Sequence, residues 1–520
     1  MRPRARGLGP LPLILAPLAG IAQAMSMASP WNGQPQWWLQ LASLAVLFGL
    51  LERAASWKTA AAAGWAFAIA WLAGTFWWLF ISMHVYGGLN PVLAAVAVLA
   101  LAAFLGLYYA AACGLAALMH GRSAVVRALG LAGAWLVAEL LRGTWFTGFP
   151  WGAGGYAHVD GPLAVFAPQL GVYGIGFVAS LIAFVLCALL QPAVRRSWKA
   201  WLAAAGAAAL LAACNMAVSH DEGPARPPLS VALLQGNIPQ DEKFEPGTGV
   251  ALALDWYRRQ LDASQSSLTV TPETAVPMLP QQLPMGYYDA MAAKFARTSQ
   301  AALIGIPLGS FQEGYTNSVI GLAPGTAAAA PYRYDKHHLV PFGEFIPPLF
   351  KWFVRLMNIP LGDFNRGALP QPPFAWAGER LAPNICYEDL FGEELGAGFR
   401  DAARAPTILV NVSNIGWFGD TVAIDQHLQI SRMRALELER PMIRATNTGA
   451  TVIVDHRGRV THQLARHTRG VLVGEVQGRT GITPFAWWVS RFGLWPLWIT
   501  GVALTGVALA AGGRRPRARP

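Results

Sequence analysis

One cysteine, Cys386, lies in the more polar part of the chain, where it directly follows the extended apolar run Leu381–Ile385. The other three, Cys113, Cys187 and Cys214, lie in long apolar segments, so Cys386 has no neighbouring thiol for a structural disulfide. A lone thiol at a strand end is a candidate nucleophile when carboxylates and a lysine occur elsewhere in the same region. The alternative is a small buried hydrophobe, which is how free cysteine usually behaves.

Two further segments place a reactive side chain just after a predicted strand. The expected strand Ser267–Thr271 is followed by Glu273, and the strand-like run Pro331–Tyr334 is followed by Lys336. Residues just beyond the carboxyl ends of strands gather in one crevice of layered α/β folds. We therefore expect Glu273, Lys336 and Cys386 to meet although they are far apart in the sequence.

A carboxylate, an ammonium and a thiol together suit acyl transfer through a thioester. A free thiol has a pKa of about 8.5 and is only a few per cent thiolate at neutral pH, so a carboxylate is needed as general base. The ammonium favours the thiolate and neutralises the oxyanion formed at an acyl carbonyl, where one such donor is worth about 3 kcal/mol. Redox chemistry would need a second thiol. His337, His338 and His427 lack the spacing of zinc ligands, so we expect surface or core roles for them, with no metal and no cofactor.

The region 220–478 is expected to form one α/β domain of about 260 residues. Near-continuous hydrophobicity in its short β-rich runs predicts strands buried on both faces of a layered sheet. The expected strands are Ser230–Gln235, Ser267–Thr271, Ala302–Ile306, Ser318–Leu322, Arg380–Ile385, Thr407–Val412, Met442–Ala445, Thr451–Val454 and Val471–Val476. The expected helices are Gly249–Ser264, Gly286–Ser299 and Ala423–Glu439. We interpret the charges near the end of the last helix as a solvated or subunit-facing surface; they are Arg432, Arg434, Glu437, Glu439 and Arg440.

The rest of the chain has the composition of a membrane protein. Of its 520 residues 54% are hydrophobic and only 13% are charged, whereas soluble domains carry about 25% charged residues. The formal net charge is +11, but the positive residues lie largely at the termini and in short loops between apolar segments. That distribution is typical of membrane orientation and does not form the basic stripe of a nucleic-acid-binding protein.

Eight apolar segments approach or exceed the roughly 20 residues that cross a bilayer as a helix. The expected spans are Leu11–Ala24, Trp37–Leu51, Ala60–Ile81, Pro91–Met119, Val125–Leu141, Val165–Leu190, Trp201–Val218 and Trp487–Ala511. The first has small residues near Ala22 and Ala24 and could be a signal peptide. We prefer a retained span because further apolar segments follow directly.

Loop charges predict the orientation, because Lys and Arg are retained on the cytoplasmic side. The loops after the second, fourth and sixth spans hold positive residues, whereas those after the first, third and fifth hold almost none. The positive residues are Arg53, Lys58, Arg122, Arg127, Arg195, Arg196 and Lys199. This pattern predicts a transmembrane domain of seven helices (1–219), an extracytoplasmic catalytic domain (220–478), and an eighth helix with a basic cytoplasmic tail (479–520).

Two other features bear on a lipid substrate. The segment Phe345–Ile359 is apolar, aromatic and too short to span, and it follows Lys336 and Glu344. We interpret it as an interfacial arm or lid that admits acyl chains; the alternative is a helix buried in the domain core. Glu139 and Arg142, three residues apart in the fifth span, are expected to form a structural pair, because intramembrane charges are costly alone; the alternative is contact with the phospholipid headgroup.

Four motifs occur in a fixed order: Thr271–Glu273, Asp335–Glu344, Asn384–Asp389 and Asn411–Gly419. Together they resemble the nitrilase superfamily with its Glu–Lys–Cys triad. The eight spans around such a domain, with Leu234–Gln240 and Thr147–Gly152, resemble the apolipoprotein N-acyltransferase family of the bacterial inner membrane. The resemblance covers nearly the whole chain. It implies a multi-span α-helical membrane domain plus an α/β nitrilase-like domain, an α-β-β-α sandwich on the periplasmic side.

By this resemblance Cys386 is the nucleophile, Glu273 the base, and Lys336 the stabiliser of the tetrahedral intermediate. Supporting acidic residues are Glu344 and Glu388, and residues around the acyl pocket are Tyr387, Trp417 and Phe418. The family commonly has a tryptophan a few residues after Gln240, whereas this chain reads Lys243-Phe244.

The implied reaction is ping-pong. Cys386 takes an acyl chain from a phospholipid, chiefly phosphatidylethanolamine. The α-amine of the N-terminal diacylglyceryl-cysteine of an apolipoprotein then attacks the thioester, in the last step of lipoprotein maturation. A membrane-tethered nitrilase-like amidase would use the same triad with water as acceptor. A channel or carrier would instead need charged or Gly/Pro-broken spans in matching halves, which the sequence does not show convincingly.

Overall fold

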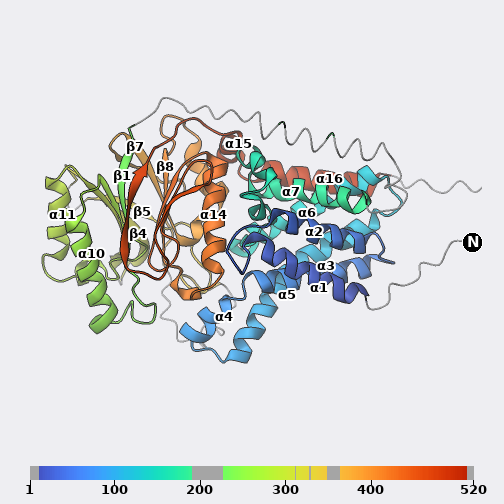
Figure 1. The fold of residues 1–520 in the computed structure, drawn as a ribbon, viewed down its shortest axis with the longest axis horizontal. Helices are drawn as coiled ribbons and strands as arrows, with labels where there is room; N and C mark the ends of the chain where they lie inside the picture. The colour runs from blue at the N-terminus through green and yellow to red at the C-terminus, as the bar shows by residue number, and fades with distance from the viewer. Residues whose placement is uncertain are drawn as a thin grey trace, which may run out of the picture. The chain divides into compact units, whose positions relative to one another are not determined.

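The computed structural model describes residues 11–189, 206, 213, 227–310, 312–326, 330–347 and 364–511. The chain divides into two compact units (Figure 1). The first comprises Met1–Trp77, Val92–His220 and Phe492–Pro520, and the second comprises Trp78–Pro91 and Asp221–Arg491. The short segment Trp78–Pro91 is therefore part of the β-rich second unit, although apolar helices precede and follow it in the chain.

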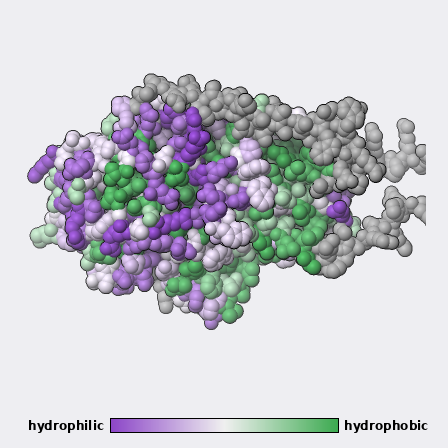
Figure 2. All heavy atoms as spheres, viewed as in Figure 1, coloured by the Kyte–Doolittle hydropathy of each residue, from purple (hydrophilic) through white to green (hydrophobic). Residues whose placement is uncertain are grey.

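The first unit is helical. Its helices are α1 (Leu11–Met27), α2 (Trp37–Leu51), α3 (Trp57–Thr75), α5 (Pro91–Leu118), α6 (Ala124–Thr144), α7 (Ala167–Leu189) and α16 (Trp495–Ala510). Serine side chains cap two of them: Ser56 accepts from the Thr59 amide and Ser123 from the Val126 amide. Large apolar side chains such as Val96 and Leu99 on α5 and Ile499 on α16 are exposed, and Figure 2 shows hydrophobic residues gathered over this unit.

By length and composition, three described helices could each cross a membrane. They are Pro91–Leu118, Ala124–Thr147 and Pro162–Leu189. The number rises to five if each of two bent helix pairs forms one span. The expected seventh span, Trp201–Val218, lies outside the described residues apart from positions 206 and 213, as do Arg195, Arg196 and Lys199.

Two expected spans are bent. The continuous helix predicted over Ala60–Ile81 ends at Thr75, and α4 (Leu79–Ile81) and a π-helical turn Ser82–Tyr86 follow at 63°. We attribute the break to packing, because Trp78 is buried against Phe418, another residue of the second unit. The predicted eighth span divides into α15 (Pro484–Phe492) and α16, which meet at 89°. Gly493 between them has a φ of 54°, a conformation that glycine adopts without cost.

Glu139 and Arg142 form a buried ion pair on α6 with a nitrogen–oxygen distance of 3.7 Å. The hydroxyl of Tyr109 bridges them, because it donates to Glu139 at 2.9 Å and accepts from Arg142 at 2.8 Å. The guanidinium also donates to the carbonyls of Phe149 and Trp151. The expected structural pairing of these two charges is confirmed.

The second unit contains two six-stranded sheets among its described residues, in the orders β12-β1-β2-β3-β4-β5 and β11-β10-β9-β8-β7-β6. The first sheet consists of β1 (Leu229–Gln235), β2 (Leu268–Val270), β3 (Ala301–Ser310), β4 (Gly314–Leu322), β5 (Tyr332–Asp335) and β12 (Gly470–Val476). The second consists of β6 (Phe374–Trp376), β7 (Glu379–Ile385), β8 (Ile408–Ser413), β9 (Met442–Thr446), β10 (Val452–Val454) and β11 (Val460–Gln463). Three consecutive strands are parallel in each sheet, β1-β2-β3 and β7-β8-β9.

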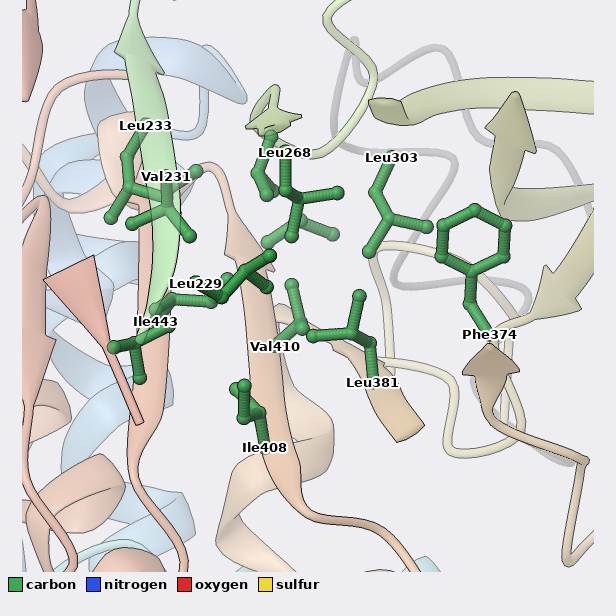
Figure 3. Close-up of a cluster of buried hydrophobic side chains, with 14 of the residues drawn as sticks. Leu229, Val231, Leu233, Leu268, Leu303, Phe374, Leu381, Ile408, Val410 and Ile443 are labelled. Atoms are coloured by element: carbon green, nitrogen blue, oxygen red, sulfur yellow. The ribbon is translucent and has the colours of Figure 1, made fainter. Parts of the chain in front are cut away.

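Side chains from both sheets share one hydrophobic core (Figure 3). Leu233 and Leu303 of the first sheet belong to the same cluster as Leu381 and Val410 of the second. On β3 the next residue, Ile304, points the other way into a second core with the helices α10 (Ala251–Ala263) and α11 (Tyr287–Arg297). Burial on both faces explains why these strands are hydrophobic throughout, and it confirms that expectation.

The nine expected strands and the three expected helices of this region are confirmed to within a few residues, and Tyr332–Asp335 confirms the strand-like run before Lys336. Two strands were not predicted. β6 has three residues and follows two prolines, and β11 is a polar edge strand with mostly exposed side chains. Most of the expected arm Phe345–Ile359 lies outside the described residues, which include only its first three positions.

The interpretation of the charges on helix α14 (Ala423–Leu438) as a solvated or subunit-facing surface is wrong. Arg432, Arg434, Glu437 and Arg440 are all buried. Arg434 pairs with Glu437 at 2.9 Å. Arg432 donates to the carbonyl of Gly458 at 2.6 Å, and Arg440 to a backbone carbonyl at 2.7 Å. Long charged side chains therefore satisfy buried backbone oxygens here, which a charge pattern alone does not reveal.

Candidate active site

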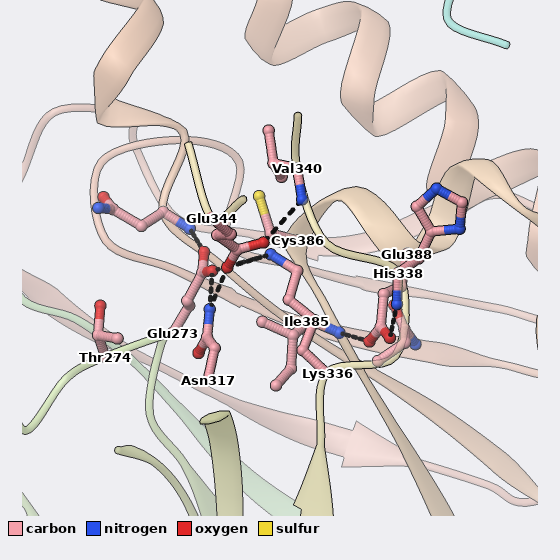
Figure 4. A network of polar contacts seen from close by, with 12 residues as sticks. Glu273, Thr274, Asn317, Lys336, His338, Val340, Glu344, Ile385, Cys386 and Glu388 are labelled. Atoms are coloured by element: carbon pink, nitrogen blue, oxygen red, sulfur yellow. Dashed lines mark hydrogen bonds and ion pairs between the residues drawn. The ribbon is translucent and has the colours of Figure 1, made fainter. Parts of the chain in front are cut away.

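The second unit brings the side chains that follow β2 and β5 into direct contact. Glu273 lies three residues beyond β2, and Lys336 directly follows β5. The Lys336 Nζ atom lies 3.3 Å from Oε1 of Glu273 and 2.9 Å from Oε1 of Glu344 (Figure 4). All three residues are buried, so the ammonium is shared by two carboxylates in a region largely closed to water.

Asn317 completes this cluster from β4. Its Nδ2 atom donates to Oε1 of Glu273 and to Oε1 of Glu344, both at 2.7 Å. The second oxygen of each carboxylate accepts a backbone amide, that of Asn414 at 2.9 Å for Glu273 and that of Val340 at 2.8 Å for Glu344. Asn317 was not predicted; the available signal was an amide side chain directly before the expected strand Ser318–Leu322.

Cys386 follows β7 and begins a 3-10 turn, and its φ of 53° is unusual for a residue with a side chain. Figure 4 draws Cys386 beside the side chains of Lys336 and Glu344. The thiol interacts electrostatically with Glu273, Lys336 and Glu344. The third predicted residue therefore joins the other two.

The charges of the cluster determine its resting protonation state. Burial and the Glu273 carboxylate raise the pKa of the Cys386 thiol to about 12, although Lys336 opposes them. Burial would raise the pKa of Glu273, but Lys336, Lys243 and two hydrogen-bond donors outweigh burial and lower it. Burial would lower the pKa of Lys336, but Glu344 and Glu273 outweigh it and raise the pKa. At neutral pH the site therefore holds a protonated thiol beside an ionised carboxylate and an ammonium.

A second buried ammonium, that of Lys243, contacts the backbone of Glu273. It donates to the backbone carbonyl of Glu273 at 3.1 Å and to the hydroxyl of Thr274 at 2.6 Å. Burial lowers the pKa of Lys243 to about 8, against the opposing charges of Glu273 and Cys386. In the sequence this lysine stood out only as part of the Lys243-Phe244 pair, and nothing there indicated contact with Glu273.

Glu388 joins the two loops that carry Lys336 and Cys386. Its Oε1 accepts the amides of His337 and His338 at 2.7 and 3.2 Å. Its Oε2 accepts the Ile385 amide at 2.6 Å and the Tyr334 hydroxyl at 2.8 Å. Burial raises the pKa of this carboxyl to about 7 despite these donors. The two predicted supporting residues thus have different contacts. Glu344 pairs with the Lys336 ammonium, whereas Glu388 accepts hydrogen bonds from the backbone amides next to Lys336 and Cys386.

The predicted pocket residues occupy two places. Tyr387 is buried, with its ring 5.3 Å from Phe391. Trp417 and Phe418 are partly exposed and meet the segment Trp78–Pro91: Trp417 lies 5.7 Å from the ring of Tyr86 and Phe418 4.2 Å from that of Trp78. No pattern in the sequence indicates that this segment contacts the two rings.

Known proteins resemble both parts of the chain. The family description "Apolipoprotein N-acyltransferase N-terminal domain" matches residues 19–185, and "Carbon-nitrogen hydrolase" matches residues 230–484. An apolipoprotein N-acyltransferase of Verminephrobacter eiseniae is 62% identical over 496 residues, which cover 92% of each chain. One of Ralstonia nicotianae is 48% identical over 508 residues, 97% of this chain and 94% of that protein. A solved carbon–nitrogen hydrolase from Helicobacter pylori G27 is 16% identical and covers 52% of this chain and 94% of its own, with a TM-score of 0.35.

Proposed function

Because the chain belongs to the apolipoprotein N-acyltransferase family, we propose that it moves an acyl chain from a phospholipid to an apolipoprotein through a thioester on Cys386. The donor is chiefly phosphatidylethanolamine, and the acceptor is the α-amine of an N-terminal diacylglyceryl-cysteine. The contact of Lys336 with Glu273, beside Cys386, is the observation that supports this chemistry best.

In the first half-reaction Glu273 acts as general base. The resting thiol is protonated, so the nucleophile forms only as Glu273 takes the Sγ proton during attack on the ester carbonyl. Lys336 stabilises the tetrahedral oxyanion. The intermediate collapses by breaking the bond to the lysophospholipid oxygen, which leaves with the proton held by Glu273. The products are a Cys386 thioester and a lysophospholipid.

In the second half-reaction the lipoprotein amine attacks the thioester carbonyl. Glu273 accepts a proton from the attacking nitrogen, and Lys336 again stabilises the oxyanion. Breaking the carbon–sulfur bond releases the N-acylated product, and the proton on Glu273 returns to the Cys386 sulfur. Cys386 is again a thiol and Glu273 a carboxylate, so the enzyme can react with another donor.

The surrounding architecture has a matching assignment. We assign eight membrane spans, with the catalytic domain on the periplasmic side of the bacterial inner membrane, where donor and acceptor both reside. The two sheets and their flanking helices would form the α-β-β-α sandwich of the nitrilase superfamily, and the domain boundaries would fall at 219/220 and 478/479. Exposed apolar residues on α5 and α16 support contact with lipid.

The proposal is tested with purified protein, phosphatidylethanolamine vesicles and a synthetic diacylated lipopeptide. We expect an N-acylated lipopeptide and an equal amount of lysophospholipid, and no product with Cys386→Ser. The amidase alternative predicts release of the carboxylic acid from a simple amide and no gain in lipopeptide mass. That second result would replace the acyltransferase assignment.

A further inference from the structure

Behind Cys386, two side chains donate to its own backbone carbonyl. His427 of α14 approaches this oxygen through Nε2 at 3.2 Å, and Asn411 of β8 through Nδ2 at 3.3 Å. Cys386 adopts a φ of 53°, a conformation that costs about 1–3 kcal/mol and persists only when its surroundings hold it. The two donors lie where they can hold this backbone.

The partners of His427 define which nitrogen carries its proton. Nη2 of Arg444 lies 2.7 Å from Nδ1 of His427. A guanidinium has only donors, so Nδ1 must accept and the proton of the neutral ring must be on Nε2. That N–H is directed to Oδ1 of Asp389 at 2.9 Å and to the carbonyl of Cys386. A doubly protonated ring would set two donors against each other at Nδ1.

The side chains that orient His427 are buried inside the domain. Asp389 also accepts from the hydroxyl of Ser431 at 2.6 Å and from Nη1 of Arg444 at 3.2 Å. Asp389, His427, Ser431 and Arg444 are each no more than 1% exposed. Buried charges are costly and seldom the most stable packing, and none of these four side chains takes part in the proposed proton transfers.

We propose that His427, fixed in one tautomer by Arg444 and Asp389, is a positioning residue that works with Asn411 to orient the peptide between Cys386 and Tyr387. The inference rests on the proposed role of Cys386 as nucleophile. In a trans peptide the C=O and N–H point in opposite directions. Holding the Cys386 carbonyl therefore fixes the Tyr387 N–H as well as the backbone from which the thiol projects.

The test compares His427→Gln with His427→Leu. The glutamine amide can accept from Arg444 through its oxygen and donate to the Cys386 carbonyl through its nitrogen, whereas leucine does neither. Because small errors in the position of a nucleophile are costly, we expect kcat of the leucine variant to fall about 100-fold with little change in KM. The glutamine variant should recover most of that loss.

Arg432→Met is the matched control. It also removes a buried polar group of α14, but Arg432 donates to the carbonyl of Gly458 and not toward Cys386. It should lower thermal stability and leave kcat of the folded protein unchanged. Wild-type kcat in His427→Leu, equal losses in the leucine and glutamine variants, or an equal loss in the control would overturn the proposal.

A second readout separates this inference from the acyltransferase assignment. The rate at which iodoacetamide alkylates Cys386, followed by mass spectrometry of its peptide, needs no lipid. We expect wild type and His427→Gln to react alike and His427→Leu severalfold more slowly. If the alkylation rates follow this order but the wild type does not acylate the lipopeptide, the proposed function is wrong and the positioning role is supported. If His427→Leu does not fold, Asn411→Leu removes the other donor; unchanged kcat and alkylation there would overturn the proposal.

Discussion

The ammonium of Lys336 lies 3.3 Å from the carboxylate of Glu273, although 63 residues separate the two in the chain. This contact keeps Glu273 ionised beside a protonated thiol, as a general base must be before the nucleophile attacks. Because Glu273 is already ionised, it can accept the Cys386 proton directly.

Glu273→Gln keeps the shape of the side chain and removes its ability to accept a proton. We expect kcat for lipopeptide acylation to fall by about 10²–10⁴-fold with KM for the donor nearly unchanged. Asp425→Asn is the control, since it removes a carboxylate of the same unit that pairs with Arg466. That variant should turn over like the wild type. Near-normal kcat in Glu273→Gln would remove this residue from the proton transfer.

Lys243→Met should move the acidic limb of the kcat/KM profile to higher pH. The ammonium of Lys243 is the second of two cations that lower the pKa of Glu273. Without it that pKa rises, so Glu273 becomes protonated, and activity is lost, at a higher pH than in the wild type. Lys243→Arg preserves the charge and should keep the limb near its original place. An unshifted acidic limb in the methionine variant would show that Lys243 does not affect the pKa of Glu273 and only binds its backbone carbonyl.

Much of the site's framework could be predicted from local sequence. Glu273, Lys336 and Cys386 each follow a short apolar strand, and strand ends that share an edge bring their next residues together. Asn317 and Lys243 could not be predicted in the same way. Each reaches Glu273 only after separate segments have packed, and neither carries a local pattern that names its partner.

Helix α14 shows the same limit more sharply. Its charged residues look like those of a solvated face, but they are buried. Arg432 donates to a backbone carbonyl of another segment, and Arg434 pairs with Glu437 of the same helix. The bend after Thr75 likewise depends on Trp78, whose indole donates at 3.0 Å to Gln426, 348 residues away. Contacts over such separations leave no periodicity in the sequence.

Glu388 should make stability depend on pH. Its pKa is raised from 4.5 to about 7 in the folded protein, so its contribution is fully present below pH 4.5 and is lost as pH rises through 7. The difference corresponds to roughly 3 kcal/mol in the free energy of unfolding. Glu388→Gln removes this titration. It also places an amide donor against donors such as the Ile385 amide, so it should be less stable overall.

The measurement is thermal unfolding of wild type and Glu388→Gln in detergent from pH 4.5 to pH 8. The advantage of the wild type over the variant should shrink as pH rises. A constant difference across this range would contradict the raised pKa of Glu388.

Phe418→Ala should impair long acyl chains more than short ones. The Phe418 ring packs 4.2 Å from that of Trp78 and is partly exposed, which suits contact with lipid. Each methylene buried against such a surface contributes about 0.8 kcal/mol. The ratio of kcat/KM for long over short donors should therefore fall. Trp256→Ala, which removes a ring packed on Tyr257 of α10, should leave that ratio unchanged, and an unchanged ratio in Phe418→Ala would exclude this ring from the acyl pocket.

We propose that the sulfur of Cys386 carries the acyl group from the phospholipid to the lipoprotein amine. Purified protein is incubated with phosphatidylethanolamine of defined chain length, quenched in acid and digested, and the peptide containing Cys386 is weighed by mass spectrometry. We predict one added acyl mass on that cysteine, which disappears when the diacylated lipopeptide is supplied. Lipopeptide acylation that proceeds without this adduct, or at full rate in Cys386→Ala, would contradict the role of Cys386 as the acyl carrier.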